Sequence, residues 1–413
     1  MSFSRRALLG NAAALSALAG IGWHPKMARA AATERKFIFF YAGGGWDTTT
    51  VFDPHHGSDF VDMDIDTLTE SLGNLAFTGG EPRENTTRFF RRWGNRTAIV
   101  NGIDARSVGH ESGRQFALTG TSASSYPDWP TLLAAKSRGA YPLPHVVFSG
   151  PNYPGSFGGS VVRAGGGALL NLIDGSIVGR ADQPAPLPPT PADSIVDAFV
   201  YERTADFAAR RGGRANALLD NLDRSMEIEG RRFEAGLSDL GNSVAEQAIK
   251  AAEMMRLGLC RCAMIQMRGG FDSHGNNLVQ GAQFEDFFAD LDLVMDHLAS
   301  TPGLATPWLI DEVVLVAISE FGRTPLLNGN GGKDHWPYNS ALLVGSGVRG
   351  NRMVGRTDSG LIAMPIDLQT GMADDNGDML ACEHFGTALL KLGGIDPQSH
   401  LPGVQVLEAV LRS

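Results

Sequence analysis

Six short apolar runs, each ending in glycine, constrain the fold of this chain more than any other feature. They are rich in β-branched and aromatic residues and show little polar alternation, which is typical of strands buried on both faces of a parallel sheet. Helical patterns lie between them, and alternation of strands and helices predicts an α/β fold with a mostly parallel sheet between helices. The runs are residues 36–43, 97–102, 145–150, 262–270, 312–322 and 340–345.

The helical patterns are longest in the second half of the chain. Residues 215–259 predict one or two long amphipathic helices, and 283–298 and 383–392 predict shorter ones. The proline-rich stretch 183–192 must be extended or looped. We interpret it as a surface connection inside a single domain, residues 31–413, because strands on both sides are needed for one sheet. A split into two domains near this stretch is the alternative.

The N-terminus has the pattern of an export signal. Arg5 and Arg6 precede an apolar run, residues 12–23, and an Ala-x-Ala cleavage site ends at Ala30. Paired arginines in this place predict a twin-arginine signal peptide, residues 1–30, and hence a periplasmic or secreted protein that meets the twin-arginine translocase. The run is too short to span a bilayer, so no transmembrane segment is expected in the mature chain. A chance basic start on a cytosolic chain is the alternative.

Charge and cysteine content narrow the possible partners. Loss of residues 1–30 would remove four basic residues and no acid, so the formal charge would change from −10 to −14. Such acidity argues against a nucleic-acid partner, whose recognition depends on Lys and Arg. The three cysteines, Cys260, Cys262 and Cys382, are too few and too scattered for a disulfide framework, and we interpret them as buried small apolar residues.

Polar clusters follow four of the predicted strands, and in parallel α/β sheets such strand ends converge on one rim. The first is Gly43–Thr49, with Asp47 and Thr48 directly after glycines. The second holds Asp272 and His274, two residues apart, a pair that suits zinc or manganese. Each cluster alone could instead be a polar turn or helix cap.

The third cluster is the most informative. A buried strand runs into Glu320 and Arg323, and a short Gly/Asn loop leads to Asp334 and His335. The carboxylates and the imidazole could ligate a metal, while the guanidinium could bind phosphate or sulfate oxygens in a fork. A structural Arg–Glu pair beside a turn is the alternative.

The fourth cluster contains Ser107 and His110, a hydroxyl and an imidazole in one loop. A lone loop histidine is more often structural than catalytic, so the joint occurrence of the clusters carries the argument. No P-loop or dinucleotide-binding glycine pattern is present, which leaves nucleotide hydrolysis and hydride transfer without support.

The motifs Ser319–Pro325 (SEFGRTP), Gly332–Pro337 (GKDHWP) and Gly269–Asn277 (GGFDSHGNN), behind a twin-arginine leader, resemble the bacterial family called domain of unknown function 1501. That family is placed in the alkaline phosphatase and sulfatase superfamily. The resemblance implies an alkaline-phosphatase-like sheet between helices, with a metal site at the strand ends.

The resemblance also implies roles for single residues. Asp47 matches the superfamily's first metal-binding aspartate, and the pairs Asp272/His274 and Asp334/His335 match later ligands. The superfamily's Asp-His-Gly strand end is here Glu320-Phe321-Gly322. Phenylalanine therefore replaces a histidine ligand, so a two-metal site of the superfamily's kind would be incomplete here. The superfamily's phosphomutases carry a nucleophilic Ser or Thr four residues before the His of a Gly-His. That position is Arg106 here, with Ser107 as the nearest hydroxyl and Thr48 as a second candidate.

We therefore expect an exported hydrolase of phosphate or sulfate esters that uses a divalent metal (zinc, manganese, magnesium or calcium). Its expected metal ligands are Asp47, Asp272, His274, Glu320, Asp334 and His335, and its expected catalytic residues are Ser107 or Thr48, His110 and Arg323. The alternative is a non-catalytic, metal-stabilised envelope protein that binds an anionic polymer. A purely structural protein without an ion is a third possibility.

Overall fold

The computed structural model describes residues 34–164 (except 124 and 140), 191–213 together with 215, 216, 219 and 222, and 242–412. The predicted signal peptide, most of the proline-rich stretch and most of residues 217–241 lie outside this part of the chain. The expectations about the export signal and about a single domain therefore stay predictions.

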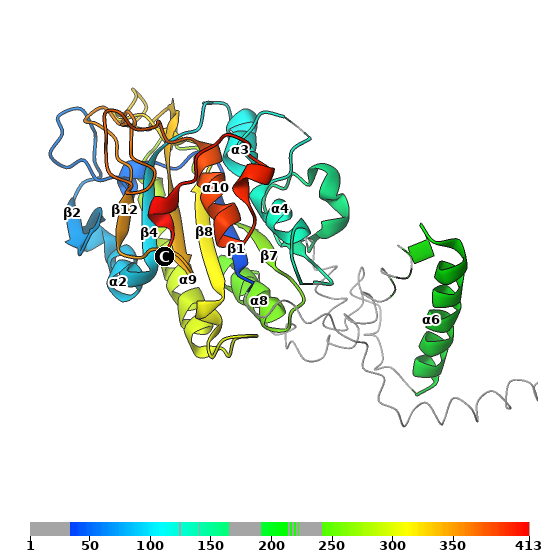
Figure 1. Cartoon of the computed structure of the whole chain (residues 1–413). Helices are drawn as coiled ribbons and strands as arrows, with labels where there is room; N and C mark the ends of the chain where they lie inside the picture. The colour runs from blue at the N-terminus through cyan, green and yellow to red at the C-terminus, as the bar shows by residue number, and fades with distance from the viewer. Residues whose placement is uncertain are drawn as a thin grey trace, which may run out of the picture.

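An eight-stranded sheet forms the centre of the described structure (Figure 1). Its spatial order is β12-β4-β11-β8-β1-β7-β5-β6. The strands are β1 (Lys36–Ala42), β4 (Thr97–Asp104), β5 (His145–Val147), β6 (Val161–Arg163), β7 (Cys262–Gln266), β8 (Val313–Ser319), β11 (Tyr338–Gly345) and β12 (Arg352–Val354).

The sheet is mixed but mostly parallel. β1 pairs in parallel with β7 and β8, whereas β11 is antiparallel to both of its neighbours, β4 and β8. The carboxyl ends of β1, β4, β7 and β8 therefore meet at one edge. All six apolar runs are strands of this sheet, which confirms the predicted fold class.

Both faces of the sheet are buried, as the continuous apolar runs predicted. Along β1, Ile38 and Phe40 face one core and Phe37 and Phe39 the other. Each face is covered by helices (Figure 1). The first core contains residues of α2 (Glu84–Trp93), α8 (Val244–Arg256) and α9 (Val279–Ser300); the second contains residues of α3 (His110–Thr119), α4 (Trp129–Ala135) and α10 (Cys382–Leu392).

The predicted helices 283–298 and 383–392 correspond to α9 and α10, and the end of the predicted 215–259 helix corresponds to α8. α6 (Pro191–Arg211) begins at the end of the proline-rich stretch and stands apart from the sheet in Figure 1. The described residues also form two small two-stranded sheets. One pairs β2 (Thr67–Leu72) with β3 (Leu75–Gly80), and the other pairs β9 (Gly322–Arg323) with β10 (His335–Trp336). The three cysteines are buried and free, as expected.

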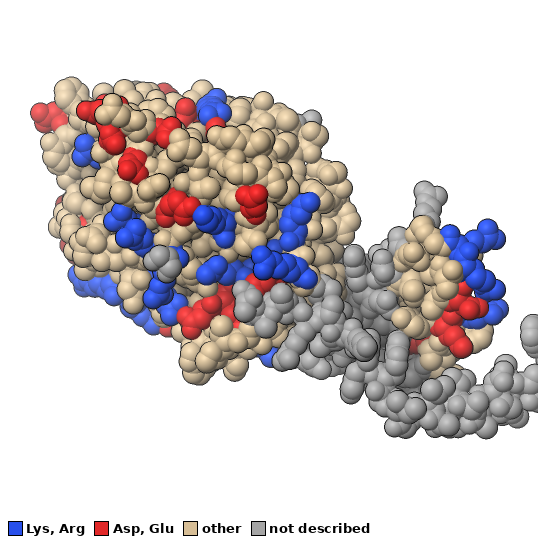
Figure 2. All heavy atoms as spheres, viewed as in Figure 1, with Lys and Arg blue, Asp and Glu red and all other residues tan. Residues whose placement is uncertain are grey.

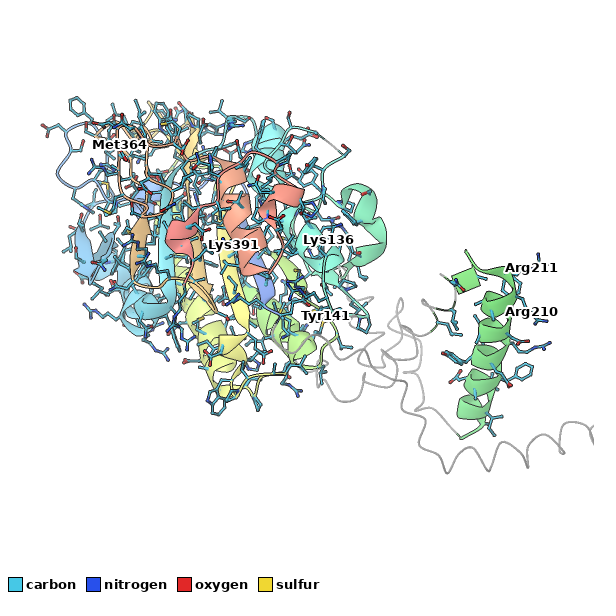
Figure 3. The ribbon with its side chains drawn as sticks, in the orientation of Figure 1. Lys136, Tyr141, Arg210, Arg211, Met364 and Lys391 are labelled. Atoms are coloured by element: carbon cyan, nitrogen blue, oxygen red, sulfur yellow. The ribbon has the colours of Figure 1, made fainter. Side chains whose placement is uncertain are left out.

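The surface carries many basic side chains on one face in spite of the net negative charge. Figure 2 shows lysines and arginines in a band across the face that α10 covers, with aspartates and glutamates between them. Lys136 and Lys391 lie on this face (Figure 3), and Lys391 forms an ion pair with Glu408 at 2.5 Å. Among the described residues, no helix is long and apolar enough to cross a membrane.

Candidate metal centre

Three of the four predicted polar clusters contribute to a single site at the carboxyl edge of the sheet. His110 is the first residue of α3, which follows β4. Asp272 and His274 lie in the loop after β7, and His335 lies on the β9–β10 hairpin after β8. These residues are far apart in sequence, and the parallel strands β4, β7 and β8 bring them together because their carboxyl ends lie at the same edge.

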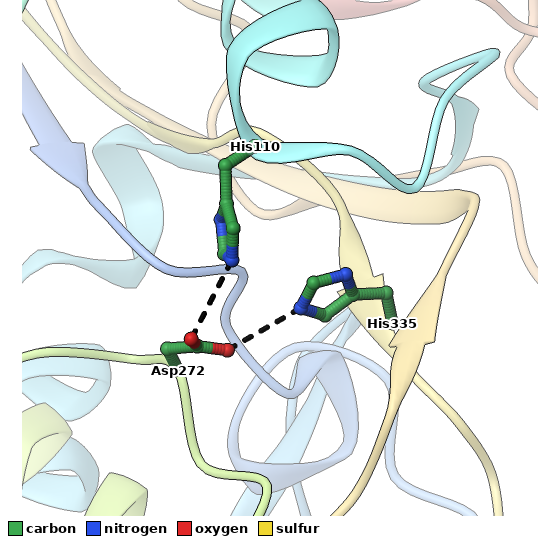
Figure 4. A group of neighbouring side chains, drawn as sticks. All are labelled: His110, Asp272 and His335. Atoms are coloured by element: carbon green, nitrogen blue, oxygen red, sulfur yellow. Dashed lines mark hydrogen bonds and ion pairs between the residues drawn. The ribbon is translucent and has the colours of Figure 1, made fainter.

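Four side chains converge at this edge (Figure 4 shows three of them). Oδ1 of Asp272 lies 3.1 Å from Nε2 of His274 and 3.3 Å from Nε2 of His335, and its Oδ2 lies 3.5 Å from Nε2 of His110. The two Nε2 atoms of His274 and His335 are 2.9 Å apart. Potential ligand atoms of His110, Asp272 and His335 all lie within 4.8 Å of one another.

The outer nitrogens of two imidazoles, those of His335 and His274, contact hydrogen-bond acceptors of the protein. Nδ1 of His335 lies 2.6 Å from the carbonyl oxygen of Val108, which can only accept a hydrogen bond. Nδ1 of His274 lies 2.7 Å from Oδ1 of Asp334. Hydrogen bonds from His274 and Asn328 lower the pKa of Asp334, so its carboxylate is an acceptor as well. These outer acceptors would hold a proton on Nδ1 of His274 and His335 when a cation is bound, which leaves the Nε2 lone pairs for the cation.

His110 is held in the same way by Glu320. Its Nδ1 lies 3.0 Å from Oε1 of Glu320, a fully buried carboxylate. The other hydrogen bonds of Glu320 come from the backbone N–H of Gly44 at 2.7 Å and from the hydroxyls of Tyr41 at 2.5 Å and Ser319 at 3.3 Å. Glu320, predicted as a ligand, instead contacts the outer nitrogen of His110.

Asp272 is ionised in this arrangement. Partial burial alone would raise its pKa, but hydrogen bonds from Arg323 and His335 outweigh that effect and bring the pKa to about 2. Nε2 atoms of three imidazoles thus lie beside one ionised carboxylate, and the Nε2 of His335 carries a proton when it donates to Asp272. Acceptors in contact repel one another unless positive charge lies between them, as protons or as a bound cation.

The donor set fits a divalent metal. Ligands about 2.0–2.2 Å from a tetrahedral zinc ion stand about 3.3–3.6 Å from each other. Separations from the oxygens of Asp272 to the three imidazoles, 3.1 to 3.5 Å, are close to this spacing, whereas Nε2 of His274 and His335, at 2.9 Å, are closer than it. Nitrogen and carboxylate ligands whose outer atoms are hydrogen-bonded are what zinc sites in proteins use.

Arg323, expected to bind a substrate anion, has its donors directed at protein atoms. Its Nε donates to the carbonyl of Gly45 at 2.8 Å and its Nη1 to the carbonyl of Lys333 at 2.9 Å. Its Nη2 donates to the carbonyls of Gly44 and Phe271 and to Oδ1 of Asp272. The guanidinium is fully buried. It therefore ties together the loops that follow β1, β7 and β8.

Asp47 lies outside the cluster, in a buried ion pair. Its Oδ2 is 2.8 Å from Nζ of Lys333, and both side chains are 1% exposed. Asp47 also accepts hydrogen bonds from Asn277 at 2.7 Å and from the hydroxyl of Thr49 at 2.7 Å. The amine thus takes the position beside this carboxylate that an ion would need.

The two candidate nucleophiles do not contact the cluster in any described interaction. Oγ of Ser107 is 2.5 Å from Oγ of Ser112, in the turn before α3. Thr48 is buried and begins a short 3₁₀ helix next to Asp47. Phe321, which stands where the superfamily has a histidine, packs its ring 4.3 Å from that of His335 and 5.1 Å from that of His110. It forms an apolar support beneath both imidazoles.

Close backbone approach explains some of the glycines. A Cβ atom on Gly332 would overlap the backbone of His274, and one on Gly44, at φ +115°, would overlap the backbone of Phe271 and Asp272. Lys333, Asn328 and Tyr41 are functional neighbours that the motifs did not reveal. Lys333 directly precedes the Asp334–His335 pair in the sequence. Because a buried lysine requires a carboxylate partner, this lysine could have indicated the ion pair with Asp47.

A family described as "Protein of unknown function (DUF1501)" matches residues 197–406, about half of the chain. The chain belongs to this family. The match covers Asp272, His274 and His335 but not His110 or Asp47. None of the curated proteins matches the chain significantly.

Solved structures with a similar fold include lipooligosaccharide phosphoethanolamine transferase A from Neisseria meningitidis, at 11% identity and a TM-score of 0.40. The match covers 98% of this chain and 65% of that one, so this chain spans less than two thirds of it. A 2-O GAG sulfatase matches at 12% identity and a TM-score of 0.34, over 91% of this chain and 72% of that one. A mutant of TAB5 alkaline phosphatase matches at 9% identity and a TM-score of 0.32, over 78% of this chain and 94% of that one. These similarities concern the fold and not the chemistry.

Proposed function

We propose that this protein is an exported, metal-dependent hydrolase of phosphate or sulfate esters with one divalent ion, held by His110, Asp272, His274 and His335. The observation that carries the proposal is that potential ligand atoms of His110, Asp272 and His335 all lie within 4.8 Å of one another, with Nε2 of His274 beside Asp272 and His335. The side chain of Asp272 is 47% exposed and that of His274 43%, so a substrate can reach this point from solvent.

The chain's own residues divide the work. Asp334, Glu320 and the carbonyl of Val108 hold the imidazole protons on the outer nitrogens, and Arg323 orients Asp272. An ion bound there would polarise an ester oxygen and lower the pKa of a water molecule. His110, expected as a general acid, serves here as a ligand.

Water, and not a side chain, is the proposed attacking group. Ser107 is hydrogen-bonded to Ser112 of α3, and Thr48 is buried beside Asp47. Neither hydroxyl has a described contact with the four converging side chains. The buried Asp47–Lys333 pair supports a single ion in place of two.

The test is metal content of natively exported protein by mass spectrometry, together with hydrolysis of aryl phosphate and aryl sulfate. Wild type and the matched control His400→Ala should hold about one ion per chain and hydrolyse one of the esters. Asp272→Ala and His335→Ala should lose both. Folded wild-type protein without metal would contradict the proposal.

A second candidate is a non-catalytic protein that uses the ion for stability and binds an anionic polymer. Four protein ligands can leave a tetrahedral ion without an open position, as in structural sites. The basic band on the α10 face (Figure 2) offers a surface for such a polymer. In cobalt-substituted protein, phosphate or sulfate should change the visible absorption spectrum of an open, catalytic site and leave that of a closed site unchanged.

A further inference from the structure

A groove of about 430 Å³ is lined in part by the residues that directly follow His274 in the chain. Three segments far apart in sequence form its walls: the chain before β2, the loop between β7 and α9, and the β9–β10 hairpin loop. The lining residues are Asp62–Ile65, Gly275–Leu278, Leu327, Asn330 and Gly331. Its volume lies within the range of small-molecule sites, about 300–1,000 Å³.

Each wall exposes a large apolar side chain. Ile65 is 75% exposed, Leu278 60% and Leu327 47%. Phe60 and Leu326, close in sequence to the lining residues, are 64% and 51% exposed. Apolar side chains gathered in a concave site, and not scattered singly, mark a surface that binds an apolar group.

The groove and the metal centre share structural elements. Gly275 directly follows His274 in the chain. Nδ2 of Asn328, in the hairpin loop, donates to the carbonyl of His274 at 3.0 Å and to Oδ1 of Asp334 at 3.1 Å. The backbone N–H of Asn277 donates to the carbonyl of Gly331 at 3.0 Å and so joins two walls. One ligand can therefore contact the groove and the centre together.

The charges of the groove orient such a ligand. Asp64 is paired with Arg83, and Oδ2 of Asp62 accepts a hydrogen bond from the backbone N–H of Leu327 at 2.7 Å. Asp62 remains exposed, so an anionic group is repelled from the groove. The anionic end of a ligand is directed to the cation, and its uncharged end to Ile65, Leu278 and Leu327.

We propose that the substrate is an amphiphilic ester, whose charged phosphate or sulfate head lies at the metal centre and whose single apolar chain or ring lies in this groove. This inference rests on the proposed function for the identity of the head group. The groove is too small for a folded partner, and it selects for the part of the substrate that does not react.

The test is calorimetric titration of the metal-loaded full-length mature protein with ethyl, butyl and hexyl phosphate below their micellar concentrations. Affinity should rise about twofold per added methylene, the factor expected for half-buried methylenes. Leu278→Asn and Leu327→Asn should remove most of this dependence on chain length. Leu293→Asn is the matched control, because Leu293 is 58% exposed on α9 and does not line the groove.

The slope with chain length tests the groove, and the affinity of ethyl phosphate tests the centre. Removal of the metal with a chelator should lower the affinity for all three alkyl phosphates by the same factor and leave the dependence of affinity on chain length unchanged. If affinity rises with chain length as expected but no ester is hydrolysed, the proposed function is refuted and the groove proposal stands. A wild-type slope of zero, or equal losses in Leu278→Asn and Leu293→Asn, would overturn the groove proposal.

Sedimentation with neutral phosphatidylcholine vesicles separates a groove from a membrane-inserting surface. Wild type and Leu278→Asn should both stay in the supernatant. Vesicle binding that Leu278→Asn abolishes, combined with no slope for the soluble phosphates, would also overturn the proposal.

Discussion

Asp47 and Asp272 both follow strands of the central sheet at the same edge, yet their surroundings are opposite. Asp47 is 1% exposed and forms an ion pair with Lys333, with further hydrogen bonds from the side chains of Asn277 and Thr49. Asp272 is 47% exposed and faces three imidazoles. A carboxylate at a strand end is thus not sufficient for a metal site.

The difference lies in what neighbours supply. Around Asp47 the protein provides its own cation, and every partner donates. Around Asp272 the Nε2 atoms of three imidazoles face the carboxylate, and acceptors on their outer nitrogens leave these Nε2 atoms available to a bound cation. The predictions below test this contrast from the largest expected effect to the smallest.

Lys333→Met should have the largest effect on stability. Removal of one partner of a buried ion pair leaves an uncompensated charge and costs about 3–5 kcal/mol in the free energy of unfolding. Urea denaturation measures it. The double variant Asp47→Asn/Lys333→Met should recover much of the loss. A loss below about 1 kcal/mol in Lys333→Met would show that Asp47 does not depend on the amine.

Metal binding should stabilise the wild type and not His335→Ala. An ion present at about 100 times its Kd adds about 2.7 kcal/mol to the free energy of unfolding. Thermal denaturation with and without chelator measures this difference, and His400→Ala should behave as wild type. Equal metal stabilisation of His335→Ala would place the ion elsewhere.

Glu320→Gln should weaken metal binding about 10- to 100-fold, because the hydrogen bond that fixes the proton of His110 becomes weaker. Competition with a chromophoric chelator measures the Kd. The matched control is Glu312→Gln, a buried carboxylate paired with Lys36 at 2.6 Å, which should leave the Kd unchanged. Equal Kd values for Glu320→Gln and wild type would contradict the role given to Glu320.

The buried His145 should make the fold sensitive to acid. Burial and the nearby Arg163 lower its pKa to about 3, from an ordinary value of 6.5. Between these two values the unfolded chain binds a proton that the folded chain does not. Stability should therefore be lost as pH falls from about 6.5 to 3, by up to about 1.4 kcal/mol per pH unit.

Metal-free protein in chelator allows this measurement without interference from the metal centre. His145→Gln should remove this part of the pH dependence in urea denaturation. Curves of the same slope for His145→Gln and wild type would show that His145 is not responsible.

Ser107→Ala should have the smallest effect. If water attacks the ester, the turnover number and the metal Kd stay within about twofold of wild type, since loss of the Ser112 contact is a surface change. Steady-state kinetics on the aryl ester measure this. A loss of a hundredfold or more would make Ser107 the nucleophile and contradict the proposed water mechanism.

The sequence predicted the sheet well because both-face burial leaves a strong trace. The six apolar runs are all strands of it. The glycine ends of five runs lie at the edge where polar side chains gather, whereas the antiparallel run 340–345 ends at the opposite edge. Pairs close in sequence, such as Asp272 and His274, could also be placed together from their spacing.

The contacts between clusters could not be predicted, because they depend on how loops pack in space. Nothing in its motif distinguished Asp47 from Asp272 until the amine of Lys333 was placed. Arg323 has the composition of an anion-binding residue, but the carbonyls of three loops occupy its donors. Glu320 and Asp334 have the chemistry of ligands, and only geometry shows that they hold the outer nitrogens of His110 and His274.

The guanidinium of Arg323 has a consequence for how quickly the proposed ion could come and go. It holds the loops after three strands together from the inside, so the ligand-bearing backbone is preassembled. Release of an ion would then require only rotation of partly exposed imidazoles. A chelator should accordingly strip the metal in a fast step that is separate from unfolding, and the emptied protein should rebind metal without passing through a folding step.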